Sequence, residues 1–91
     1  MSDQEVVATE GTVALLGGHP VGIGNISERT YALPDGAERR GLTSMLSFAD
    51  DTTLIAGPGS DLDLAGARWR VIHVAEGSTG PGSVTFLPDP G

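Results

Sequence analysis

The chain has 91 residues, no cysteine and a formal net charge of −7. This length supports a single small core, and the lack of cysteine excludes a disulfide framework and thiolate chemistry. The acidic balance disfavours nucleic-acid and membrane partners, because phosphate backbones and anionic membrane surfaces repel a protein of the same sign.

The start of the chain, MSDQEVVATEG, is acidic and has no apolar stretch of the kind that a secretory signal requires. Small secreted domains usually depend on disulfides, and none can form here. No apolar run approaches the roughly 18 residues of a membrane span. We therefore expect a cytoplasmic protein. Its use of Arg with no Lys indicates a GC-rich genome.

Short runs rich in β-branched residues alternate with turn sequences along the chain, and no helical periodicity lasts for three turns. The predicted strands span residues 6–16, 21–26, 29–34, 42–48, 52–56, 61–64, 68–76 and 83–88. The first is expected to kink near Gly11. The sequences GGHP, DG, ADD, GPGS, AGA and GSTGPG separate the strands as turns or loops.

Seven or eight short strands at this spacing predict an all-β fold, either a small antiparallel barrel or a two-sheet sandwich. Neither a fixed repeat nor an internal linker divides the chain. We expect one β domain over residues 1–91, with frayed ends at residues 1–4 and 88–91.

The run 68–76 has the clearest pattern. Side chains alternate along a strand, so Trp69, Val71 and His73 are predicted to share one face, with His73 pointing inward. Three interpretations of His73 stay open. It is a core histidine bonded to a neighbour, a pocket-lining residue, or a metal ligand together with His19. The two histidines show no ligand spacing that supports the third.

Asp61 and Asp63 alternate with Leu62 and Leu64, which predicts acidic side chains outward and apolar ones inward. Clustered carboxylates supply some of the six to eight oxygens that Ca²⁺ prefers. The run does not extend to an EF-hand loop, however, and edge charges that block strand-to-strand aggregation explain the same residues. Asp61 and Asp63 are therefore weak metal candidates, and no metal site is predicted.

No catalytic residue is predicted. The sequence GGHPVGIG lacks the glycine spacing and the Lys of a phosphate loop, and the Gly-Ser pairs do not form a nucleophile elbow. Aromatic residues are too few for a platform that stacks single-stranded nucleic acid. These absences favour a non-enzymatic protein without a cofactor.

Residues 53–88 resemble a pattern found in short all-β proteins of GC-rich actinobacteria. In that pattern an acidic or Gly-rich turn precedes L-x-G-x-x-W-x-V, a loop and a final V-T-L/F strand. The matching residues are Leu64, Gly66, Trp69, Val71, Val84, Thr85 and Phe86. The resemblance implies a β fold, and it transfers no functional residue.

Together these observations predict a small non-catalytic binding module that acts through self-association or a protein partner. Its contact surface is expected around Trp69, Ile72 and Val74, because a chain with many short strands has edges to cover. The alternative is a small β-barrel ligand carrier or enzyme. Its pocket would be lined by Trp69, His73, Tyr31 and Phe86, with His73 as acid–base.

Overall fold

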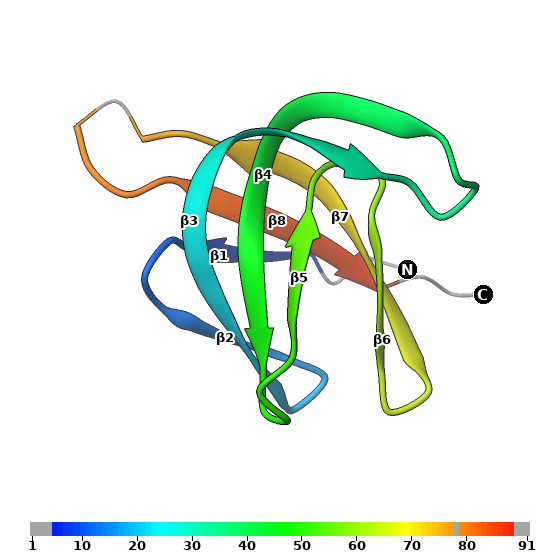
Figure 1. Ribbon diagram of the computed structural model, residues 1–91. Coiled ribbons are helices and arrows are strands. Elements are labelled where there is room, and N and C mark those ends of the chain that lie inside the picture. Colours follow the sequence, from blue (N-terminus) through cyan, green and yellow to red (C-terminus); the bar gives the residue numbers. More distant parts are fainter. Residues whose placement is uncertain (1–4, 78, 89–91) are drawn as a thin grey trace.

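The computed structural model describes residues 5–77 and 79–88, and these residues form eight strands without a helix (Figure 1). The strands are β1 (Val6–Thr9), β2 (Val13–Leu16), β3 (His19–Ala32), β4 (Glu38–Phe48), β5 (Thr53–Ala56), β6 (Asp61–Leu64), β7 (Ala67–Ala75) and β8 (Ser83–Pro88). The all-β prediction is confirmed. Within the described residues, no helix is long and apolar enough to cross a membrane.

Two antiparallel sheets of four strands each make up the fold. The first sheet has the order β1-β8-β7-β6, and the second has the order β2-β3-β4-β5. In Figure 1 the strands β3 to β5 cross β1 and β8 at a steep angle. From the strand orders, the chain passes from one sheet to the other at two places, between β1 and β2 and between β5 and β6.

The first change of sheet divides the predicted strand 6–16. The chain bends at Gly11, whose φ of +87° is a conformation that glycine adopts without steric cost. The Gly11 N–H donates to the carbonyl of Ile23 at 2.7 Å, and the Ile23 N–H donates to the carbonyl of Thr12 at 2.9 Å. The predicted kink is therefore a full break that sends β1 and β2 into different sheets.

The second change of sheet is the GPGS turn. Ser60 closes it, because its N–H donates to the Gly57 carbonyl at 2.9 Å and its hydroxyl accepts from the Gly57 N–H at 3.0 Å. The Gly59 N–H then donates to the carbonyl of Val71 at 2.8 Å. Tyr31 covers the turn, with its hydroxyl donating to the Pro58 carbonyl at 2.8 Å.

Two predicted strands, 21–26 and 29–34, are one long strand in the structure. β3 pairs with β4 from Val21 to Ala32, with a shift of register between Gly24 and Ile26. The glycines of β3 weaken the strand locally, but pairing with the long neighbour β4 still provides hydrogen-bond partners for its backbone. His19 and Pro20 also belong to β3, so the predicted GGHP turn is reduced to its two glycines, which both have positive φ.

The later strands follow the prediction closely. β6 and β8 have the predicted bounds, β5 begins one residue later, and β7 begins and ends one residue earlier than predicted. β4 begins four residues before the predicted strand 42–48 and ends at the predicted residue. Pro88 ends β8 rather than lying in a frayed end, whereas the rest of the predicted frayed ends, 1–4 and 89–91, lies outside the described residues. The predicted DG turn joins β3 to β4.

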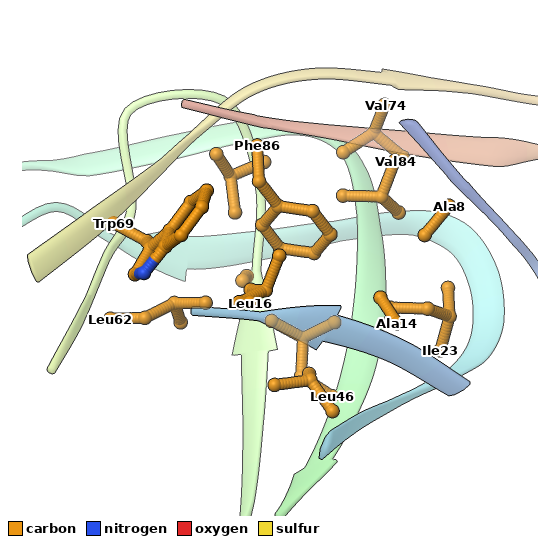
Figure 2. Close-up of a cluster of buried hydrophobic side chains, with 13 residues drawn as sticks. Ala8, Ala14, Leu16, Ile23, Leu46, Leu62, Trp69, Val74, Val84 and Phe86 are labelled. Carbon is orange, nitrogen blue, oxygen red and sulfur yellow. The ribbon is translucent and has the colours of Figure 1, made fainter. Parts of the chain in front are cut away.

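The core lies between the two sheets. Figure 2 shows Phe86 of β8 pointing toward Leu16 of β2 and Leu46 of β4, and all three side chains are fully buried. Burying a side chain of this size contributes about 1.5–3 kcal/mol. The other core residues are Ala8, Ala14, Val21, Ile23, Ala56, Leu62, Trp69, Val71, Val74 and Val84.

Candidate functional site

His73 does not lie beside Trp69 as predicted. The pairing of β7 with β8 shifts by one residue between Val71 and His73, so that Ile72 is an extra residue in the strand. Such a bulge reverses the alternation of side chains beyond it. Trp69, Val71 and Val74 are buried, whereas Ile72 and His73 are exposed. The prediction of an inward His73 is therefore wrong.

Because of the bulge, neither the predicted contact surface nor the predicted pocket, which both include residues of β7, forms as one surface. In the expected contact face, Trp69 and Val74 are core residues and only Ile72 reaches solvent. In the expected interior pocket, Trp69, Tyr31 and Phe86 are buried by packing, and His73 points away from them. Tyr31 holds the turn between β5 and β6, which is a structural role.

The two histidines belong to different sheets, His19 to β3 and His73 to β7. Asp61 is in an ion pair, with its Oδ1 2.9 Å from the Nε of Arg70. The carboxylate of Asp63 accepts a hydrogen bond from the N–H of Gly66, in the turn that follows β6. Within residues 5–77 and 79–88, no group of three or more His, Asp or Glu side chains is placed to hold a metal ion.

An open groove of about 490 Å³ lies between β5 and β6. β5 is the last strand of the second sheet and β6 is the last strand of the first sheet. All four residues of β6 line this β5–β6 groove, together with the first two of β5. Its lining residues are His19, Pro20, Phe48, Ala49, Asp50, Thr52, Thr53, Leu54, Asp61, Leu62, Asp63, Leu64 and Ala65.

The apolar part of the groove is a continuation of the core. Leu62 is buried, and Phe48 and Leu64 are half-buried against the core cluster. Leu54 lies further out and is 37% exposed. An occupant of the groove would thus remove from water apolar surface that the two sheets leave uncovered between them.

The polar part of the groove is acidic. The carboxylate of Asp50 accepts hydrogen bonds from the hydroxyl of Thr52 at 2.6 Å and from its N–H at 3.1 Å. These bonds lower the pKa of Asp50 below its ordinary value, and the bond from the Thr52 hydroxyl has the larger effect. They therefore favour the charged carboxylate. Asp63 Oδ1 accepts the N–H of Gly66 at 3.0 Å. Among the described residues, neither Asp50 nor Asp63 is in an ion pair.

The sequence contains part of this site. It places Asp61 and Asp63 outward and Leu62 and Leu64 inward on β6, although Asp61 is partly covered. It gives no sign that His19, Phe48 and Leu54 meet these residues, because it does not show which two strands end the sheets.

No protein-family model matches the sequence, and no curated protein or solved structure matches the chain. The resemblance of residues 53–88 to actinobacterial all-β proteins therefore stays a prediction. The functional proposal rests on the geometry of the β5–β6 groove.

Proposed function

We propose that this protein is a non-catalytic interaction module that binds a protein partner in the β5–β6 groove. One observation carries the proposal: an open groove of about 490 Å³ lies between β6, an end strand of the first sheet, and β5, an end strand of the second. An end strand offers unpaired backbone N–H and C=O groups on its outer side, and natural proteins either protect such an edge or use it for recognition.

The polar residues of the groove support binding rather than catalysis. Asp50 fixes the turn in which it lies, Asp63 fixes the turn that follows β6, and Asp61 is held by Arg70. Groups that are fixed in this way form a surface that is already arranged before a partner arrives. Pre-arrangement lowers the conformational cost of association.

Site-specific photo-crosslinking in the producing cells tests this function. A photoreactive phenylalanine analogue at Leu54 samples the groove, and the same analogue at Ile72 is a matched control, because both side chains are 37% exposed. We expect a discrete crosslinked protein from position 54 that position 72 does not give. Crosslinks of equal yield from both positions, or none from position 54, would contradict the proposal.

The same experiment distinguishes a small-molecule carrier from a protein-binding module. A groove of about 490 Å³ also falls within the size range of small-ligand sites. A crosslink at position 54 that adds the mass of a small molecule, with no protein product, would replace the protein partner by a ligand.

Self-association is a second candidate function, and a different surface supports it. On β2, Val13 and Leu15 are 64% and 66% exposed, and no charged residue interrupts the strand. β2 is also an end strand of its sheet. Native mass spectrometry tests this candidate. We expect a dimer that Leu15→Glu converts to a monomer, and a monomeric natural protein would exclude this function.

We also propose that the two sheets act as one partly open barrel rather than as a sandwich of independent sheets. Backbone pairing that continues up to both changes of sheet supports this. The Glu10 N–H bonds to Gly82 beside β8 and the next N–H, of Gly11, bonds to Ile23 of β3, while the Gly59 N–H bonds to Val71 of β7. In a barrel these amides exchange with solvent as slowly as core amides do. Rapid exchange at Gly59 and Gly11 would favour the sandwich.

A further inference from the structure

We infer that the partner of the β5–β6 groove is an extended basic segment that pairs with β6 as an added strand and places Arg or Lys side chains against Asp63 and Asp50. This inference rests on the proposed function of the groove. It adds the chemistry and the conformation of the occupant.

The conformation follows from the place of β6. Its four residues all line the groove, and its one strand neighbour among the described residues is β7. The side that faces the groove therefore offers a backbone edge to an extended chain. Strand addition satisfies such an edge through main-chain hydrogen bonds and gives specificity through alternate side chains. β5 contributes only Thr53 and Leu54 to the groove and forms the opposite wall.

The side-chain pattern of the occupant follows from the pattern of β6. Leu62 is buried and Leu64 is half-buried, whereas Asp63 is exposed on the other face. Directly opposed side chains on paired strands interact, and opposite charges there are favourable. A segment that alternates apolar and basic residues would match both faces, with apolar side chains against the leucines and a basic side chain beside Asp63.

The charge of the occupant follows from the acidic groove. Asp50 and Asp63 are exposed carboxylates without an ion pair among the described residues, whereas Asp61 already has Arg70 beside it. The chain as a whole carries a net charge of −7, which attracts a basic partner. Such complementarity increases the association rate and selects against acidic competitors.

A peptide panel tests the inference on the full chain by fluorescence anisotropy at pH 8. The probe is a labelled hexapeptide that alternates Arg and Val, with both ends blocked. One comparison peptide replaces Arg by Glu. A second keeps the side chains but carries a backbone N-methyl group on every residue, which removes the hydrogen-bond donors from both edges of a strand. We expect only the unmodified Arg/Val peptide to bind.

Two variants and a salt series test the role of charge. Asp63→Asn keeps the oxygen that accepts the Gly66 N–H and removes the charge, and Glu38→Gln removes one exposed charge at the start of β4, outside the groove. We expect Asp63→Asn to weaken the Arg/Val peptide by about 3-fold, the scale of an exposed ion pair, and Glu38→Gln to change nothing. Raising the salt from about 0.05 M to 0.5 M should weaken binding several-fold, because it screens these charges.

The outcomes separate the inference from the proposed function. Equal binding of the Glu peptide, or an affinity that neither salt nor Asp63→Asn changes, overturns the basic occupant. Equal binding of the N-methylated peptide overturns strand addition. If no peptide binds while the analogue at Leu54 still crosslinks a protein, the inference fails and the proposed function stands. If both experiments are negative, both are rejected.

Discussion

At the scale of single residues, Glu10 connects three separate segments of the chain. Its carboxylate accepts the N–H of Ile26 at 2.9 Å and the N–H of Gly82 at 3.3 Å, and its own N–H donates to the Gly82 carbonyl at 2.9 Å. The bond from Ile26 and then the bond from Gly82 lower the pKa of Glu10, against the opposite effect of desolvation.

This lowered pKa predicts a pH dependence. A carboxylate whose pKa is lower in the folded state stabilises the fold above its unfolded-state pKa, and this contribution is lost as the pH falls through the folded-state pKa. We expect Glu10→Gln to be less stable than the natural protein at neutral pH and equally stable in acid, where Glu10 is protonated. Urea denaturation at both pH values measures this. A difference that persists unchanged in acid would contradict the role of the charge.

Gly57 has no room for a side chain. A Cβ there would overlap the ring of Tyr31, whose hydroxyl is bonded to the Pro58 carbonyl. We expect Gly57→Ala to destabilise the protein by about 1–3 kcal/mol, as overpacking does. Gly41→Ala is the control, because nothing lies within 4 Å of its Cβ position and its φ is not positive. Similar thermal midpoints for the two variants would show that Tyr31 moves freely.

At the scale of the element, the bulge in β7 determines which side chains reach the core. We expect Val74→Ala to cost about 2 kcal/mol and His73→Ala to stay within about 0.5 kcal/mol, since Val74 is buried and His73 is exposed. Chemical denaturation of both variants measures this. A larger loss for His73→Ala would restore the regular strand that the sequence predicted.

The bounds of single strands are partly predictable from the sequence. β6 and β8 are bounded by Gly and Pro residues, so period-two alternation locates both strands. The bulge at Ile72 has no such signal, because Val71, Ile72 and Val74 are all apolar and fit either face. The sequence predicts β3 as two strands, the first of them weakened by glycines, whereas the pairing with β4 that joins them is a long-range property.

At the scale of the whole molecule, the arrangement of strands produces the candidate site. β1 pairs with β8, so that Val6 lies opposite Phe86 and the two ends of the described chain meet in one sheet. Local patterns carry no record of such pairings, so the all-β class was predictable and the two end strands beside the groove were not. The sequence alone indicates the exposed carboxylates of β6, whereas the fold is needed to bring His19, Phe48 and Leu54 beside them.

The most direct test of this account is amide hydrogen exchange, followed by NMR, with and without the Arg/Val peptide. If an extended segment pairs with β6, backbone amides of residues 61–64 that face the groove will exchange more slowly in the complex. Amides of β2, an end strand none of whose residues lines the groove, will not change. Protection at β2 instead of β6, or a bound peptide that protects no amide of β6, would contradict the account.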